Sequence, residues 1–287
     1  MNNNDLTQQT TVPDTKQYEN NPFFIATNGL DLLFKKAQSI GIALAIIAGL
    51  SLLSSVPSYF VPGPSGQSEP AATAASKADE ANFMNTISNI PAEVWIIVAL
   101  VILLILTILV LIGTVIKGVT DVTSAHIAND KTITISQALR EVFANFWGYL
   151  WVQVVMSVKV FLWTLLFIIP GIVMSVRYSL AGVVYFDKKL KGNASVVESA
   201  RMTKGVWLTT FASQSLLNIL TLGLITSILT PGTNAVLYRQ FSKLEEPKPR
   251  AHVLSWLTLI IPVILTILVL LLILLTIAAF ANYVQTT

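Results

Sequence analysis

Two basic side chains lie within stretches that are otherwise strongly apolar. Lys159 stands near the middle of residues 147–169, and Arg177 stands shortly after the Pro170-Gly171 pair that ends this stretch. A charged side chain at the centre of a bilayer costs at least about 2.5 kcal/mol, so each cation needs carbonyls, water, an anion or a route to the surface. Lys159 and Arg177 are therefore candidates for binding an anion, for which a lipid phosphate is the simplest chemistry.

A second interpretation of the two cations needs no ligand. In it, the Lys159 stem extends to the membrane surface, and Arg177 reaches the outer headgroups or caps nearby carbonyls. The predicted spans contain no Asp or Glu that could pair with either cation. If the chain turns at Pro170-Gly171, the two side chains start at depths of about 16 and 10 Å from that turn and can converge. Both interpretations stay open.

Amide and hydroxyl side chains recur along the middle apolar stretches, between residues 147 and 240. Gln153, Gln214 and Asn218 are the candidate polar core residues. Hydrogen bonds between helices account for such residues, and a polar pathway is the alternative. Because the stretches 93–116 and 253–279 are almost bare of these groups, we expect the middle helices to face one another and the bare ones to face lipid.

No residue pattern in the chain indicates catalysis or a metal site. His126 and His252 lack metal-ligand spacing, and Asp121 and Asp130 are expected to be solvated loop residues near His126. There is no Gly-rich phosphate loop, nucleophile elbow or HExxH pattern. Cysteine is absent, which removes thiolate chemistry. The sequence therefore predicts no enzyme, no cofactor and no catalytic residue.

The composition indicates that transmembrane helices position these basic and amide side chains. The chain has 287 residues, of which 54% are hydrophobic and only 11% charged, whereas soluble domains carry roughly 25% charge. Its pI near 9.0 does not indicate nucleic acid, because the basic residues form short clusters beside apolar stretches and no continuous basic face. The prediction is an all-α, polytopic transmembrane bundle of about seven spans with short amphipathic interfacial helices.

The expected spans alternate with polar segments. They cover 37–56, 93–116, 147–169, 171–186, 206–221, a return from a turn at Leu222-Gly223 to 240, and 253–279 with a kink at Pro262. Residues 136–146 are expected to form a surface helix. Ser195 and Glu198 have capping-box spacing for another short helix that reaches Lys204.

Four regions follow from this pattern. Residues 1–36 are expected to be a disordered cytoplasmic tail with an amphipathic approach, and 37–129 to hold the first two spans with an outer loop at 57–93. Residues 130–244 form the membrane core of two helix hairpins, and 245–287 the linker and last span. Asp187, at the inner end of its span, is expected to join a solvated cluster with Lys188 and Lys189.

The distribution of basic residues predicts the orientation. With a cytoplasmic N-terminus, fifteen of the 18 Lys and Arg residues lie on the cytoplasmic side, and only Lys77 lies outside. This is the positive-inside pattern of a bacterial cytoplasmic membrane. In an alternative arrangement, residues 206–229 form one span and the chain does not return before Arg239. The basic segment 239–250 would then lie outside, so the positive-inside rule disfavours this alternative. We expect no cleavable signal peptide, since the first residues are polar.

The two hairpins are weakly similar at an offset of 61 residues. Arg140 matches Arg201, Gln153 matches Gln214, and Pro170-Gly171 matches Pro231-Gly232. A parallel repeat of the kind found in transporters would explain the matches, and so would chance in apolar sequence.

A longer segment carries a family resemblance. The stretch PGIVMSVRYSLAGVVYFDKKLKGNASVVESARMTKGVW, with TISQALREVFANFW before it and AVLYRQF after it, resembles bacterial inner-membrane proteins of uncharacterised activity. These proteins are related to the membrane domain of glycerophosphodiester phosphodiesterases. The shared features are Pro170-Gly171, Asp187, Ser199, Arg201 and Lys204-Gly205, within residues 130–244. The resemblance implies a membrane domain without the soluble catalytic domain, and the long outer loop and last span depart from the family pattern.

Two functions remain from the sequence. The first is a non-enzymatic membrane protein whose central helices bind or move a lipid, such as an anionic lipid, or another amphiphile. The second is a structural or assembly factor that holds protein partners, whose identity the sequence leaves open. Lipid movement predicts a water-accessible cavity at Lys159 and Arg177, whereas an assembly role predicts a packed core and an exposed partner surface.

Overall fold

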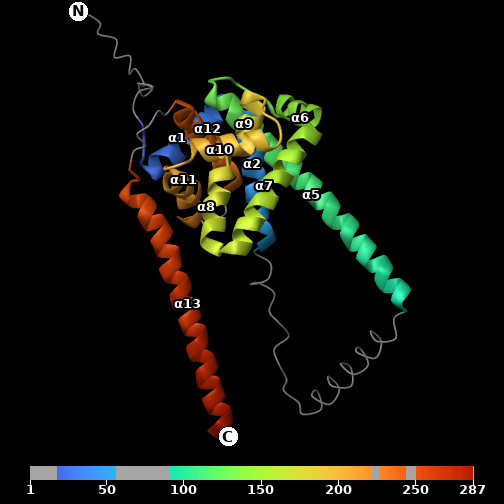
Figure 1. Ribbon diagram of the computed structural model, residues 1–287, viewed down its shortest axis with the longest axis vertical. Coiled ribbons are helices and arrows are strands. Elements are labelled where there is room, and N and C mark those ends of the chain that lie inside the picture. Colours follow the sequence, from blue (N-terminus) through green and yellow to red (C-terminus); the bar gives the residue numbers. More distant parts are fainter. Residues whose placement is uncertain (1–17, 56–90, 221–225, 244–249, 287) are drawn as a thin grey trace, which may run out of the picture. The chain divides into compact units, whose positions relative to one another are not determined.

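The computed structural model describes residues 18–55, 91–220, 226–243 and 250–286, and every element in these ranges is an α-helix (Figure 1). The predicted all-α fold is confirmed for this part of the chain. The chain divides into two compact units, one of residues 1–48 and 118–287 and the other of residues 49–117. The helices are α1 (Pro22–Lys36), α2 (Gln38–Ser55), α5 (Ala92–Ala128), α6 (Ile135–Ala144), α7 (Phe146–Leu166), α8 (Ile168–Tyr178), α9 (Ala181–Lys188), α10 (Asn193–Met202), α11 (Trp207–Leu220), α12 (Thr226–Lys243) and α13 (Val253–Thr286).

Within the described residues, four stretches are long and apolar enough to cross a membrane. They are Glu93–Ala128, Phe146–Leu166, Ile168–Lys188 and Val253–Ala279. A bent pair, Pro22–Lys36 with Gln38–Leu50 at 117°, can count as a fifth. Helix α11 has only 14 residues, which give about 21 Å against a hydrocarbon core of about 30 Å. Seven spans are therefore not confirmed, and the predicted turn at Leu222-Gly223 lies outside the described residues.

Helix α1 belongs to the core of the larger unit, which corrects the expectation of a surface approach. Ile25, Ala26 and Leu33 are completely buried, and α1 packs against α11 and α12. At the crossing, the backbone of Gly29 touches that of Gly232, and a Cβ at either position would overlap the other chain segment. Two glycines thus allow two helix backbones to meet directly, which an amphipathic pattern does not reveal.

Helix α5 continues to Ala128, through residues that the sequence placed in a polar loop. Its polar side chains Asp121, Thr123 and Ser124 are completely buried in the larger unit. The expectation that Asp121 is a solvated loop residue is therefore wrong, and the candidate span Glu93–Ala128 includes it. The helix can continue because the buried face of this segment contacts other helices of the bundle, which supply partners for its polar groups.

The turn between α7 and α8 lies at Phe167, whose backbone is extended, and not at Pro170-Gly171. Pro170 stands in the first turn of α8, where a missing N–H costs no helical hydrogen bond. Gly171 lies against Thr164 of α7, and a Cβ there would overlap that threonine. The Pro-Gly pair therefore starts the returning helix and lets it approach α7 closely.

The two short helices also differ from their predicted roles. Helix α10 begins at Asn193, so Ser195 lies inside the first turn and donates to the Gly192 carbonyl at 2.9 Å, instead of capping the helix. On α6, Ala138 and Val142 face the core, whereas Phe143 is 62% exposed. One side of α6 is therefore free for solvent or membrane.

The two long apolar helices have exposed surfaces. None of the apolar window of Glu93–Ala128 or of Val253–Ala279 is buried, whereas half of the window in Ile168–Lys188 is buried. This exposure agrees with the prediction that the bare helices face lipid. The smaller unit ends at residue 117, which lies within α5, so the buried segment 118–128 belongs to the larger unit.

Candidate functional site

Lys159 and Arg177 contact the two ends of the same short helix. The Lys159 ammonium donates a short hydrogen bond to the side-chain oxygen of Asn193, the first residue of α10. It also lies 5.9 Å from the ring centroid of Tyr178. Arg177 Nη2 donates to the carbonyl of Ala200 at 2.9 Å, in the last turn of α10. The two contacts are about 10 Å apart along the helix.

The Arg177 contact is reciprocal. Ser199 Oγ and Thr203 Oγ1 donate to the Arg177 carbonyl at 2.8 and 3.0 Å. The C-terminal end of α8 and that of α10 therefore exchange hydrogen bonds, and the guanidinium lies at the negative end of the α10 dipole. Both cations have protein partners, and neither lines the two cavities described below. The shared anion site stays a prediction.

The predicted polar core residues fall into two places. Gln214 Nε2 donates to Ser179 Oγ at 3.1 Å and to Asn234 Oδ1 at 2.8 Å, which joins α11 to α12 and to the end of α8. Asn218 donates to the Gln214 carbonyl. Gln153 lies apart from them on α7, one turn beyond Tyr149. Gln214 therefore links three helical segments, whereas Asn218 bonds within α11 and its Oδ1 is buried without a hydrogen-bond partner among the described residues.

A buried acid forms a third polar contact that the sequence did not reveal. Tyr149 Oη donates to Asp121 Oδ2 at 2.7 Å, and both residues are completely buried. Gly182 of α9 leaves the space that this carboxylate occupies, since a Cβ there would overlap it. No sequence signal joins Asp121 to Tyr149, because the two lie on different helices.

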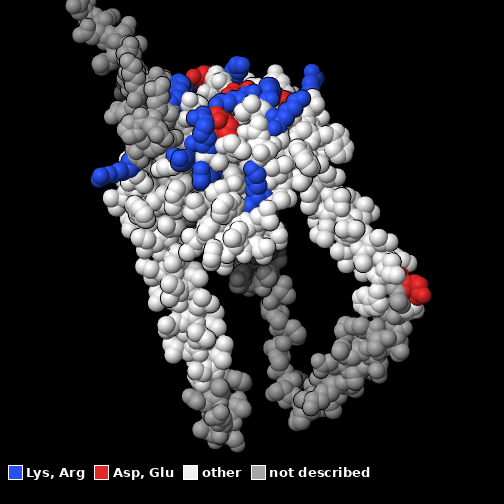
Figure 2. Space-filling model, in the orientation of Figure 1, with Lys and Arg blue, Asp and Glu red and all other residues white. Residues whose placement is uncertain are grey.

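Charged side chains gather at one end of the larger unit, around α9 and α10 and away from the turn between α7 and α8 (Figure 2). Glu141 of α6 accepts from Lys189 at 3.0 Å, and His126 Nε2 lies 3.6 Å from the same carboxylate. Glu198 accepts from Lys188 at 2.6 Å and from Arg201 at 2.7 Å. These ion pairs join α5, α6, α9 and α10.

The ion pairs lower the pKa of Glu198. The hydrogen bond from Arg201, with further help from Lys188, lowers the pKa of Glu198 to about 2. The same contact raises the pKa of Arg201. Both residues stay charged over the whole physiological pH range, so the ion pairing that joins α9 to α10 persists over that range.

Asp187 does not lie in a solvated cluster with Lys188 and Lys189, which corrects the prediction. Its carboxylate accepts hydrogen bonds from Tyr238 of α12 and from Asn129, at the end of α5. The two lysines turn instead to Glu198 and Glu141. Tertiary packing brings α12 against α9 here. The neutral donors Tyr238 and Asn129 therefore hydrogen-bond to the Asp187 carboxylate in place of the two lysines.

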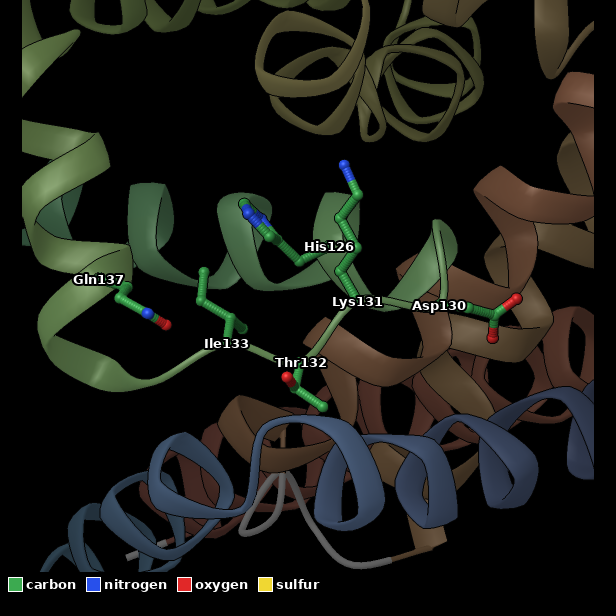
Figure 3. Close-up of a pocket in the computed structure, with 6 residues that line it drawn as sticks. All are labelled: His126, Asp130, Lys131, Thr132, Ile133 and Gln137. Carbon is green, nitrogen blue, oxygen red and sulfur yellow. The ribbon is translucent and has the colours of Figure 1, made fainter.

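Two cavities open beside this charged end and share His126 and Lys131. The smaller one has a volume of about 160 Å³ and is also lined by Glu141, Asp187 and Lys189. The larger one has a volume of about 650 Å³, and its lining adds Asp130, Thr132, Ile133 and Gln137. Figure 3 shows the His126 and Lys131 side chains extending to the same side, whereas Asp130 points away from them. Both cavities therefore present basic groups.

The loop that carries Lys131 is held by three contacts with two helices. Asp130 has a left-handed backbone with φ of 57°, a conformation that Asp tolerates better than most residues. Its carboxylate pairs with Arg239 at 2.8 Å, and its carbonyl accepts from Lys36 at 3.2 Å. The Ile133 amide donates to the Lys36 carbonyl at 3.1 Å. Helices α1 and α12 thus fix the position of Lys131.

Within the described ranges, no three His, Asp or Glu side chains are grouped to hold a metal ion. The chain matches no protein-family model, no curated protein and no solved structure. The charged end and its two cavities are therefore the candidate site on geometry alone.

Proposed function

We propose that this is a non-enzymatic membrane protein that binds a lipid or other amphiphile by its headgroup at the charged end. The observation that carries the proposal is the position of α6. Its residues Gln137 and Glu141 line the two cavities. Its other side exposes Phe143, and Trp147 at the start of α7 is 79% exposed. Exposed tryptophan residues such as Trp147 lie at headgroup level in membranes.

The charged end has better support than the central helices as the binding region. Gln214, Lys159 and Arg177 already have hydrogen-bond partners within the protein. The Lys131 ammonium, by contrast, has no hydrogen-bond or ion-pair partner among the residues that the structure describes. Basic pockets between membrane helices on the cytoplasmic side suit lipid headgroups. We therefore propose that the protein binds a lipid headgroup at the charged end and do not propose that it moves lipid through its central helices.

The orientation is part of the proposal. We infer that the charged end lies in the cytoplasm of a bacterial cell, as the positive-inside count indicates. Contacts of Asp130 with Lys36 and Arg239 support this, because they join segments that were all expected on the cytoplasmic side. A seven-span arrangement needs α11 and α12 to cross as a pair of short spans. The likeness to the phosphodiesterase membrane domain remains a prediction.

The test is lipid binding by the purified full-length protein in nanodiscs of neutral lipid. Added phosphatidylglycerol should bind with an affinity that the Lys131→Gln variant lowers about tenfold, as loss of one charge-assisted contact predicts. Lys191→Gln is the matched control, because Lys191 is exposed and lines neither cavity. Equal affinity of all three proteins would overturn the proposal.

One observation favours the second function, an assembly factor. Lys159 and Arg177 both serve to hold α10, and Val197 on that helix is 53% exposed. A helix held at both ends presents a fixed surface, on which Val197 is one apolar contact point for a protein partner. A photocrosslinker at Val197 should then capture one discrete partner in whole cells. Crosslinks to lipid alone would reject this alternative.

A further inference from the structure

The smaller cavity has two charges of opposite sign that the protein itself does not compensate. Asp187 accepts hydrogen bonds only from the neutral groups of Asn129 and Tyr238, and no Lys or Arg pairs with it among the described residues. The Lys131 ammonium likewise has no anionic partner there. Both residues line the same cavity. A partly buried carboxylate without a cation is costly, so a ligand that brings one gains affinity.

The other charged groups of the cavity are already paired. Glu141 accepts from Lys189 at 3.0 Å, and His126 lies 3.6 Å from that carboxylate. This pairing leaves Lys131 as the free anion-binding group and Asp187 as the free cation-binding group. The two groups enter the cavity from different elements, because Lys131 follows α5 and Asp187 lies in the last turn of α9. The ligand that fits must therefore carry both charges.

We propose that the cavity takes a zwitterionic headgroup, a phosphate ester that also carries a primary ammonium. The phosphate lies at Lys131, with His126 beside it, and the ammonium lies at Asp187. A volume of about 160 Å³ is that of about five water molecules, which suits a headgroup and excludes a whole lipid. The acyl chains then extend along the exposed side of α6. This inference rests on the proposed function and narrows it to aminophospholipids.

The first test changes the ligand and leaves the protein intact. In nanodiscs, wild-type protein should bind phosphatidylethanolamine about tenfold more tightly than phosphatidylcholine, whose methylated nitrogen cannot donate a hydrogen bond to Asp187. It should also bind phosphatidylethanolamine more tightly than phosphatidylglycerol, which has no ammonium. Equal binding of all three lipids would overturn the inference and leave headgroup binding standing. Binding of none of them would overturn the proposed function.

The second test changes the protein. Asp187→Asn keeps the acceptor oxygen for Tyr238 and removes the charge. It should abolish the preference for phosphatidylethanolamine over phosphatidylglycerol, while the affinity for phosphatidylglycerol stays within about twofold. The control is Asp31→Asn, on an exposed residue of α1 paired with Lys35 at 2.7 Å. A preference retained in Asp187→Asn would reject the role of Asp187.

Competition identifies the source of the headgroup. Soluble phosphoethanolamine at millimolar concentration should displace a spin-labelled phosphatidylethanolamine if the headgroup alone supplies the affinity. If it competes as well as the lipid does, the ligand is the free phosphate ester. If it fails while the lipid binds, the acyl chains contribute and the ligand is the membrane lipid. No competition by either compound would contradict the site.

Discussion

Gly182 allows the helix bundle to hold the buried carboxylate of Asp121. The Asp121 carboxylate occupies the space that a side chain at residue 182 would fill. Tyr149 donates to one of its oxygens at 2.7 Å. A buried carboxylate is tolerated only with such partners. The contact therefore depends on a glycine in a third helix.

Gly182→Ala should destabilise the protein because its methyl group overlaps the Asp121 carboxylate. Overpacking of a buried site costs about 1–3 kcal/mol. The measurement is the unfolding temperature in detergent. Gly113→Ala is the control, since nothing lies within 4 Å of a Cβ at that position. An unfolding temperature unchanged in both variants would show that the carboxylate can move at no cost.

The lowered pKa of Glu198 makes the folding stability depend on pH in the acid range. Its pKa falls from 4.5 to about 2 on folding. A lowered folded-state pKa contributes stability above the unfolded pKa, and this stability is lost as pH falls towards the folded pKa. The contribution is modest, about 1 kcal/mol, because Arg201 is largely exposed. We expect Glu198→Gln to be less stable than wild type at pH 7, by a difference that shrinks as pH falls and disappears below pH 2. A constant difference between pH 7 and pH 2 would contradict this.

At the scale of elements, α10 is fastened at both ends by cations from two other helices. Lys159 of α7 holds its first residue, and Arg177 of α8 holds its last turn. Ser199 and Thr203 return hydrogen bonds to α8. The short helix has ten residues and would be unstable alone, because isolated helices of this length are marginal in water.

Arg177→Gln should loosen the C-terminal end of α10. The lost charge no longer caps the Ala200 carbonyl at the end of the helix, so amide exchange in residues 199–203 should increase at least about tenfold. Hydrogen exchange followed by mass spectrometry measures this. Arg140→Gln is the control, on an exposed arginine of α6. Exchange that rises equally in both variants would point to general destabilisation.

At the scale of the whole molecule, the number of spans determines the side of the membrane on which each segment lies. A five-span arrangement, with α1 and α2 as one bent span, and the expected arrangement of about seven spans both cross an odd number of times. Both therefore leave the C-terminus opposite to the N-terminus. They differ in whether α11 and α12 cross and in whether α1 belongs to the first span.

Single cysteines can test the orientation, because the chain has none of its own. Ser76→Cys should react with an impermeant maleimide added to intact cells or spheroplasts. Ser242→Cys should react only after the membrane is opened, since it lies in the basic last turn of α12. Labelling of both positions from the same side would contradict the proposed orientation.

Composition and hydropathy determined the class of this protein from the sequence alone. The long apolar runs of α5, α7 and α13 and their exposed faces follow directly from residues that cannot be solvated by water. The break near Pro170 and the short surface helices were also predicted to within a few residues. These features are local, so local sequence is enough to reveal them.

Only the tertiary structure decided which polar and charged groups meet. Asp121 with Tyr149, Asp187 with Tyr238, and Gln214 with Asn234 are pairs from different helices. The burial of α1 depends on Gly29 and Gly232, which lie far apart in sequence. Hydropathy treats each stretch separately, whereas these contacts depend on helix crossings where glycines admit close backbones and each buried polar group requires a partner.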